Sequence, residues 1–192
     1  IALSALGAKV STTHDAGNVD GSDLVVYSNA ISQSNPERTR AQELNIPILT
    51  RAAALAVLMS ESKSVAVAGT HGKTTTSSML AVALQACGAD PSFAIGGTIT
   101  ASGSNAHRGT GEIFVAEADE SDGSFIEYHP YGAIVTNVEH DHVDFFATPE
   151  SVEQAFRDFA ATIKPGGFLT YCADDAGAVA LTKRATSVEL IS

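Results

Sequence analysis

The stretch Val65–Leu80 reads VAVAGTHGKTTTSSML, and it decides the fold of the surrounding chain. A short apolar run ends at Gly69, Lys73 follows four residues later, and a threonine-rich, helix-like segment begins there. The first backbone N–H groups of a helix attract anions, and glycines allow the preceding backbone to close around phosphates. We therefore predict a strand, a phosphate-binding loop and a helix, in this order.

The loop is shorter than the common phosphate-loop pattern, in which a glycine stands six residues before the lysine. That position is Val67 here, so the motif is reduced to GTHGKT. The lysine would place its charge on the terminal phosphates of a nucleotide, and the hydroxyl of Thr74 would lie where Mg²⁺ binds. The alternative is a glycine turn with a surface lysine. The predicted phosphate-binding residues are Gly69, Thr70, His71, Gly72, Lys73, Thr74 and Thr75.

The composition limits the possible partners. The 192 residues carry a net charge of −11, which gives no general affinity for nucleic acid or for an anionic membrane. Cys87 and Cys172 lack the spacing of metal ligands and indicate a reducing compartment. No apolar run approaches the roughly 20 residues that a membrane span requires, and the N-terminal residues do not show the basic-then-apolar pattern expected of a leader. A cytoplasmic protein without membrane insertion is predicted.

The rest of the chain alternates between predicted strands and helices. Strands are expected at 22–28, 46–50, 65–69, 92–97, 112–119, 131–139 and 167–172 and at the end of the chain, and helices at 35–45, 51–59, 73–87, 149–163 and 176–182. The segment 100–111 reads as a polar loop. This order predicts an α/β fold with a mainly parallel sheet and flanking helices. The small polar connection 60–64 is the expected domain boundary.

Acidic residues follow two of the predicted strands. They are Glu117, Asp119, Glu120 and Asp122 after the strand at 112–119, and Glu139, His140, Asp141, His142 and Asp144 after the strand at 131–139. Ligands of open parallel sheets bind outside the carboxyl ends of the strands. We therefore expect the phosphate loop and both clusters at one edge of the sheet, where carboxylates and substrate phosphates suit Mg²⁺. A solvated loop is an equal alternative for the two histidines.

Three motifs together resemble the Mur ligase family: GTHGKTTT at 69–76, EADESDGSF at 117–125 and NVEHDHVDFF at 137–146. The segments VVYSNAISQSNPE at 25–37 and IPILTRAAALAVLM at 46–59 extend the resemblance upstream. It is strongest to the branch that joins L-alanine to UDP-N-acetylmuramate. The resemblance implies that residues 1–62 are the last part of a Rossmann-like UDP-binding domain. Residues 63–192 would then belong to a phosphate-loop-type ATP-binding domain.

The resemblance also implies a reaction. The enzyme would use ATP and Mg²⁺ to join L-alanine to the carboxylate of UDP-N-acetylmuramate through an acyl phosphate, in peptidoglycan precursor synthesis. Lys73 and His142 would be catalytic. Thr74 and Glu117 would ligate one Mg²⁺, and His142 would ligate a second. The residues implied for the uridine-diphosphate part are Ser28, Asn29 and Arg51.

Three other functions stay open at this point. The ligase that recycles murein tripeptide is similar, although its acidic motif usually has a tyrosine where Ser121 stands. A folylpolyglutamate-type ligase shares the shortened loop, and a non-catalytic phosphate-loop module would lack the second metal site. Both ends of the sequence fall inside predicted elements, so we expect a fragment of a longer protein. The adenine and alanine sites would then lie beyond residue 192, and the fragment alone would be inactive.

Overall fold

The computed structural model describes residues 2–183 and 188–192. The chain forms two compact units, one ending at Ala54 and the other beginning at Leu55. The helix α3 (Arg51–Ser60) contains the point of division. The prediction of an α/β fold with a mainly parallel sheet and flanking helices is confirmed.

The first unit contains a small parallel sheet. The elements before α3 are α1 (Ala2–Ala5), the 3-10 helix η1 (Ala16–Val19), β1 (Val25–Tyr27), α2 (Pro36–Glu43) and β2 (Ile48–Thr50). The strands β1 and β2 pair with Tyr27 opposite Thr50. The side chain of Asn35 accepts hydrogen bonds from the backbone N–H groups of residues 37 and 38, which fixes the start of α2. The predicted helix start at Asn35 and Pro36 is confirmed.

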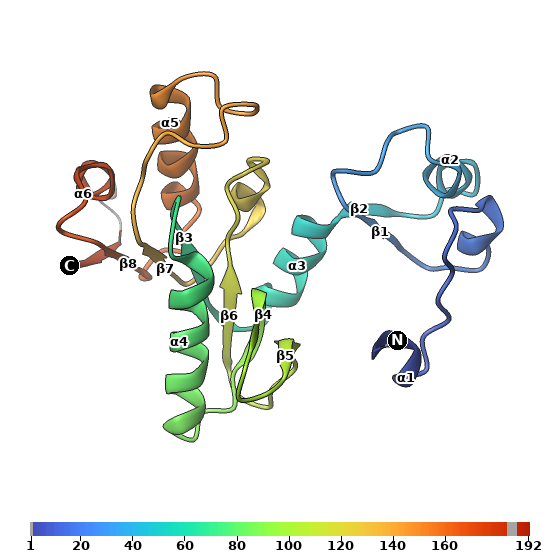
Figure 1. Ribbon diagram of the computed structural model, residues 1–192, viewed down its shortest axis with the longest axis horizontal. Helices are drawn as coiled ribbons and strands as arrows, with labels where there is room; N and C mark the ends of the chain where they lie inside the picture. The colour runs from blue at the N-terminus through green and yellow to red at the C-terminus, as the bar shows by residue number, and fades with distance from the viewer. Residues whose placement is uncertain (1, 184–187) are drawn as a thin grey trace. The chain divides into compact units, whose positions relative to one another are not determined.

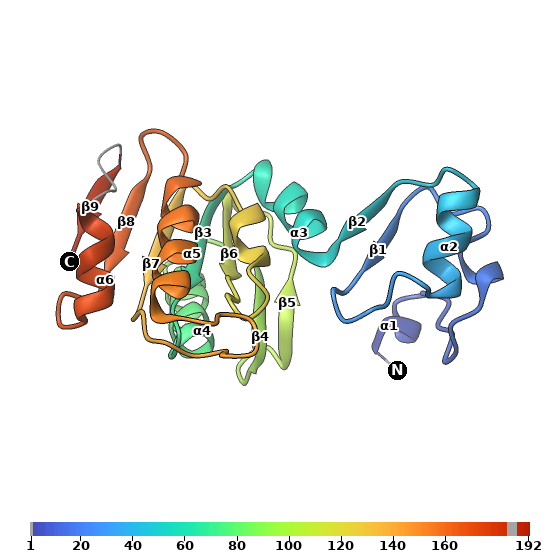
Figure 2. The ribbon, with the colours of Figure 1, turned by 90° about the horizontal axis from the view of Figure 1, so that it is seen from above.

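The second unit is built on a larger sheet. Its described strands are β3 (Lys63–Ala68), β4 (Ser92–Ile99), β5 (Ser104–His107), β6 (Ile113–Glu117), β7 (Gly132–Val135), β8 (Phe168–Tyr171) and β9 (Glu189–Ile191). Their order is β5-β4-β6-β3-β7-β8-β9, and Figure 2 shows them side by side in this order. Every neighbouring pair is parallel except β4 and β5. The phosphate loop therefore leaves from a central strand.

The prediction of a polar loop over 100–111 is wrong in part. Residues 104–107 form β5, which pairs antiparallel with β4 at the edge of the sheet. The tight turn before it passes through Gly103, whose φ is +66°. An exposed edge strand buries neither face, so its residues lack the hydrophobic alternation by which a strand is recognised in a sequence.

Helices complete the second unit: α4 (Lys73–Ala86), the 3-10 helix η2 (Ser124–Glu127), α5 (Pro149–Ala161) and α6 (Ala176–Thr182). Figure 1 shows α4 running beside β3, β6 and β4. The core beneath α4 contains Ala81, Phe93, Ile95, Ile99 and Val115. Phe125 of η2 is fully buried and stacks on Phe159 of α5 with ring centroids 4.9 Å apart. This contact anchors the end of the acidic motif at 117–125.

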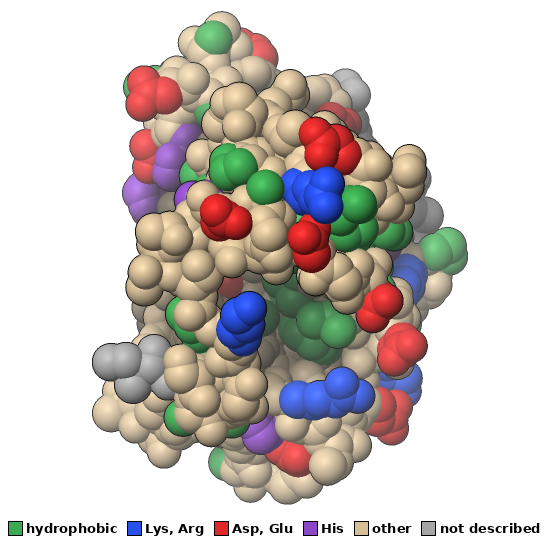
Figure 3. All heavy atoms as spheres, turned by 90° about the vertical axis from the view of Figure 1, so that its right-hand side faces the viewer, with side chains coloured by type: hydrophobic (Ala, Val, Ile, Leu, Met, Phe, Trp, Pro, Cys, Tyr) green, Lys and Arg blue, Asp and Glu red, His purple; other side chains and the backbone are tan. Residues whose placement is uncertain are grey.

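None of the helices among the described residues is long and apolar enough to cross a membrane. On the face drawn in Figure 3, Lys and Arg side chains lie scattered among acidic ones and uncharged surface.

Candidate active site

Three neighbouring strands end at one edge of the larger sheet. The central strand β3 pairs in parallel with β6 on one side and with β7 on the other. Their carboxyl ends therefore deliver the phosphate loop, the acidic motif and the acidic–histidine motif to the same place, as the sequence predicts. These three segments line a cavity of about 460 Å³ whose described residues are Thr70, His71, Gly72, Lys73, Thr74, Thr75, Glu117, Asp119, Ser121, Asp141 and His142.

The two glycines of the loop have conformations that require glycine. Gly69 has φ +138° and Gly72 has φ +82°, and L side chains rarely adopt either. A Cβ at position 69 would lie 2.0 Å from Oγ1 of Thr136, so the position has no room for a side chain. Gly72 is the N-cap of α4 and provides no side-chain cap. The first N–H groups of α4 therefore have no capping side chain from Gly72, and a helix start of this kind can bind an anion.

The end of β7 holds the loop in shape. The side-chain amide of Asn137 accepts a hydrogen bond from the N–H of His71 at 2.8 Å and donates one to its carbonyl at 3.1 Å. Oγ1 of Thr136 donates to the same carbonyl at 2.6 Å. The hydroxyl of Thr70 donates to the carbonyl of Glu139 and accepts from its N–H. The loop is thus fixed by hydrogen bonds without any ligand.

Lys73 lies inside the site and is largely buried. Its Nζ donates to the carbonyls of Gly69 and Thr70 at 2.8 and 3.3 Å and contacts both carboxylate oxygens of Glu120 at 2.9 and 3.0 Å. The side chain of Glu120 is only 2% exposed and that of Lys73 12%. Oε1 of Glu120 also lies 3.3 Å from Nε2 of His142. Both residues predicted to be catalytic therefore contact the same buried carboxylate.

Thr74 and Glu117, the two residues expected at the first metal, are in direct contact. Oγ1 of Thr74 donates to Oε1 of Glu117 at 2.9 Å, and the N–H of Gly96 donates to Oε2 at 2.6 Å. A Cβ at Gly96 would lie 2.9 Å from the carboxylate, and one at Gly97 would lie 2.7 Å from the methyl group of Thr74. The glycine pair on β4 therefore leaves the space that the Thr74 methyl group and the Glu117 carboxylate occupy.

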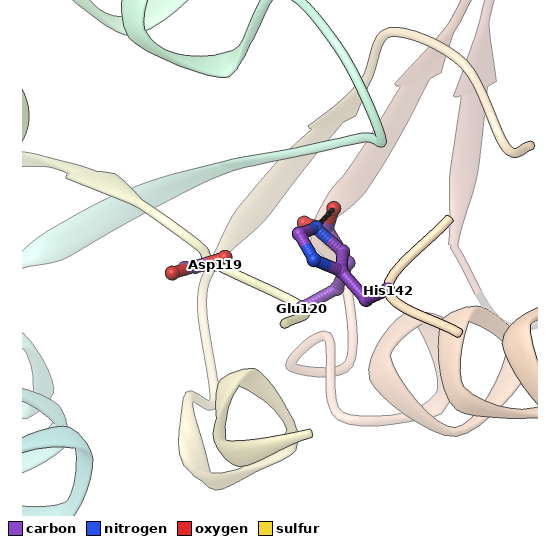
Figure 4. A group of neighbouring side chains, drawn as sticks. All are labelled: Asp119, Glu120 and His142. Carbon is purple, nitrogen blue, oxygen red and sulfur yellow. Dashed lines mark ion pairs between the residues drawn. The ribbon is translucent and has the colours of Figure 1, made fainter. Parts of the chain in front are cut away.

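Figure 4 shows the second group of possible metal ligands, Asp119, Glu120 and His142. One ligand atom from each lies within 4.8 Å of the others. Two carboxylates and one imidazole can hold a divalent cation, and the carboxylates suit Mg²⁺ better than the imidazole does. His142 has φ +51°, and its N–H donates to the Asp141 carboxylate at 2.7 Å. This hydrogen bond lowers the pKa of the Asp141 carboxyl group.

The residues expected to contact the uridine-diphosphate part lie in the first unit. Ser28 and Asn29 directly follow β1, and Arg51 directly follows β2. Because β1 and β2 are parallel neighbours, all three residues are at the same edge of the small sheet, and all three are exposed. This edge is the one at which ligands of parallel sheets bind.

Two regions of the chain match models of one protein family. Residues 67–191 match the model of the Mur ligase middle domain, and residues 2–63 match the model of the Mur ligase family catalytic domain.

Two proteins with similar sequences are both named UDP-N-acetylmuramate--L-alanine ligase. A UDP-N-acetylmuramate--L-alanine ligase of a Nocardioides species is 55% identical over 183 residues, which are 95% of this chain and 41% of that protein. One of Rhodococcus jostii is 52% identical over 96% of this chain and 38% of its own length. The chain spans about two fifths of the length of these relatives.

Two solved structures are similar over nearly the whole chain. The UDP-N-acetylmuramate-alanine ligase of Thermotoga maritima has a TM-score of 0.81 and 31% identity, over 93% of this chain and 42% of its own. The UDP-N-acetylmuramate:L-alanyl-gamma-D-glutamyl-meso-diaminopimelate ligase of Neisseria meningitides has a TM-score of 0.88 and 28% identity. That alignment covers 98% of this chain and 64% of the other.

Proposed function

The chain belongs to the Mur ligase family, and on this premise we propose that the full-length protein joins L-alanine to the carboxylate of UDP-N-acetylmuramate at the expense of ATP. Relatives with 50–55% identity over most of the chain bear the name of that ligase, which supports the choice within the family. The product would be a peptidoglycan precursor, made in the cytoplasm.

The contact between Thr74 and Glu117 is the geometric observation that best supports the proposal. Thr74 begins a helix after a phosphate loop, and its hydroxyl is 2.9 Å from the Glu117 carboxylate at the end of a neighbouring strand. A hydroxyl and a carboxylate beside a phosphate loop are the ligands with which proteins hold Mg²⁺ on the β- and γ-phosphates. The site therefore supports the binding of a magnesium–triphosphate.

The reaction would proceed in two steps, as the family resemblance implies. The sugar carboxylate attacks the γ-phosphorus of ATP, ADP leaves, and an acyl phosphate forms. The amine of L-alanine then attacks the acyl carbon, and phosphate leaves. The first step brings a carboxylate and a triphosphate together, and positive charge must offset their repulsion. Lys73 would supply this charge at the γ-phosphate.

The metal ligands of the chain would divide into two sets. Thr74 and Glu117 would hold the first Mg²⁺, and His142 would hold the second, near the acceptor carboxylate. The bound cations would neutralise charge as the two anions approach each other. The ATP-binding residues would be those of the loop, 69–75, and the close contacts of residues 136 and 137 support a fixed loop geometry before the nucleotide binds.

We further propose that the domains are residues 1–62, the last part of a Rossmann-like UDP-binding domain, and 63–192, part of the ATP-binding domain. The matched ranges 2–63 and 67–191 support this division, while the compact units divide earlier, after Ala54. Ser28, Asn29 and Arg51 would contact the uridine-diphosphate part. Their shared position at the carboxyl ends of β1 and β2 supports that role.

A second candidate is the ligase that attaches a tripeptide rather than L-alanine, because the Neisseria structure with that activity in its name has the TM-score of 0.88. One assay separates the two. The full-length protein is incubated with MgATP and UDP-N-acetylmuramate, and with either L-alanine or L-alanyl-γ-D-glutamyl-meso-diaminopimelate. Phosphate release and the product mass are measured. Product with L-alanine is expected; product with the tripeptide alone would replace the proposal by the second candidate.

A further inference from the structure

The buried carboxylate of Glu120 is not among the residues to which the proposed reaction assigns a role. It lies between the two groups proposed to be catalytic, 2.9 Å from Nζ of Lys73 and 3.3 Å from Nε2 of His142. Its side chain is 2% exposed. A buried charge is tolerated only with a close partner of opposite charge, because transfer out of water costs several kcal/mol for each ion. Lys73 is that partner here.

The hydrogen bonds of Lys73 leave no donor for a phosphate. An ammonium group has three N–H donors. Within the described part of the chain they are used by three acceptors: the carbonyls of Gly69 and Thr70 and the carboxylate of Glu120. The Glu120 contact is the charged one of the three, and charge-assisted hydrogen bonds are about twice as strong as neutral ones. A nucleotide phosphate must therefore compete with Glu120 for the lysine.

We propose that Glu120 is a positioning residue with two alternative positive partners. Without a nucleotide, its carboxylate holds Lys73; when ATP binds, Lys73 moves to the phosphate and the second cation takes its place beside Glu120. The proposal rests on the nucleotide site proposed above. Once Lys73 turns to a phosphate, the Glu120 carboxylate needs a new positive partner. His142 and Asp119 place ligand atoms within 4.8 Å of it, so these three residues would share a divalent cation. ATP and the second cation then each favour the binding of the other.

This exchange has a distinctive consequence for substitutions. Glu120→Gln keeps the size of the side chain and removes its charge, so Lys73 is no longer held by an anion. ATP should then bind more tightly, while the chemical step should slow because the second cation has lost a ligand. A side chain with a merely structural role would not move these two quantities in opposite directions.

The experiment measures ATP binding by calorimetry with EDTA present, in the full-length protein and in two variants. We expect Glu120→Gln to bind metal-free ATP at least about fivefold more tightly than the wild type, a gain of about 1 kcal/mol. Asp119→Asn is the matched control. It removes one negative charge from the same cavity, but its carboxylate accepts a hydrogen bond from the N–H of Ser121 instead of holding the lysine. We expect a clearly smaller gain for this variant.

The same proteins are then assayed with saturating Mg²⁺, where Glu120→Gln should show a lower kcat together with a lower KM for ATP. Circular dichroism checks that each variant is folded. If Glu120→Gln does not fold, Glu120→Asp is measured instead. It keeps the charge but shortens the side chain by one methylene group, so it should raise the affinity for metal-free ATP by a smaller factor than that expected for Glu120→Gln. Equal or weaker binding in the folded variant, or a gain equal to that of Asp119→Asn, overturns the inference. Failure of the wild type to bind ATP even with Mg²⁺ would instead overturn the proposed function.

Discussion

Gly69 offers the sharpest test of how the phosphate loop is held. In Gly69→Ala, the new Cβ would lie 2.0 Å from Oγ1 of Thr136 and would occupy a backbone conformation with φ +138°. Holding a non-glycine residue in such a region costs about 1–3 kcal/mol. The hydroxyl of Thr136 would also have to leave its acceptors on Ala68 and His71, at about 0.5–1.5 kcal/mol each. We expect a destabilisation of about 2–6 kcal/mol.

The matched control is Gly88→Ala at the other end of α4. Gly88 also has a positive φ, +80°, but a Cβ there would meet no heavy atom of the described residues within 4 Å. Only the backbone cost of about 1–2 kcal/mol should remain. Urea denaturation of the full-length protein gives both free energies of unfolding, and calorimetry gives the affinity for MgATP. Only Gly69→Ala should weaken that affinity strongly.

A double variant tests the cause directly. Thr136→Ala removes the atom that the new Cβ would meet, so Gly69→Ala should cost less in this background than in the wild type, by about 1 kcal/mol or more. If the two substitutions are additive, or if Gly69→Ala and Gly88→Ala are equally mild, the close approach between β7 and the loop does not hold the loop, and the reasoning is refuted.

Three further predictions concern the chemistry and the pH dependence. Lys73→Ala should lower kcat by at least about a thousandfold, or about 4 kcal/mol of barrier, and leave the binding of UDP-N-acetylmuramate nearly unchanged. Steady-state kinetics measure kcat and calorimetry measures the binding. A variant that keeps a tenth of wild-type kcat would contradict the role assigned to Lys73. His142→Ala should lower kcat much more than it raises KM for ATP; a kcat within a few-fold of wild type, with only the melting temperature reduced, would make His142 structural. The third concerns Asp90, whose pKa is lowered by hydrogen bonds from the backbone of Thr110 and from His107. Its carboxylate therefore stabilises the fold above the unfolded pKa near 3.8, and this stability is lost as pH falls through the lower folded value. Asp90→Asn should be less stable than the wild type at pH 7, and the difference should shrink as the pH falls below 3.8, as measured by urea denaturation; a difference that stays constant as the pH falls would count against the prediction.

The parts of the site that follow from local chemistry could be predicted from the sequence. A glycine before a lysine and a threonine, placed between an apolar run and a helical pattern, fixes a loop at a helix start, because the N-cap position favours glycine and the first turn tolerates the hydroxyl. The common edge of the three segments follows from the parallel arrangement of their strands. The strand at 131–139 is nevertheless shorter than expected, since β7 ends at Val135 and the polar residues beyond it turn to the loop.

The parts that depend on tertiary contacts could not be predicted. Three carboxylates follow β6 closely, at 119, 120 and 122, and nothing in their order distinguishes the buried Glu120 from the exposed Asp119, because the strand periodicity ends at Glu117. The sequence likewise does not single out Thr136 and Asn137, which contact the loop across more than 60 positions of the chain. Both fall inside the strand expected at 131–139, and a strand pattern does not show that they contact the loop. The signal that could have found them is their position near the carboxyl end of a predicted parallel strand, the end at which the loop was also expected.

The pairing of β3 with β7 also bears on how the molecule is made. The hydroxyl of Thr70 bonds to the backbone of a residue 69 positions later, and the register places Val65 opposite Gly132. Contacts between such distant segments form late, because the entropy of closing a long loop is lost before any contact compensates for it. On the ribosome, β3 and α4 leave the exit tunnel long before β7, so the nucleotide loop spends that interval without Thr136 and Asn137. Nascent chains whose residue 139 is still inside the tunnel should therefore leave this loop open to proteases, and chains whose residue 139 has emerged should protect it.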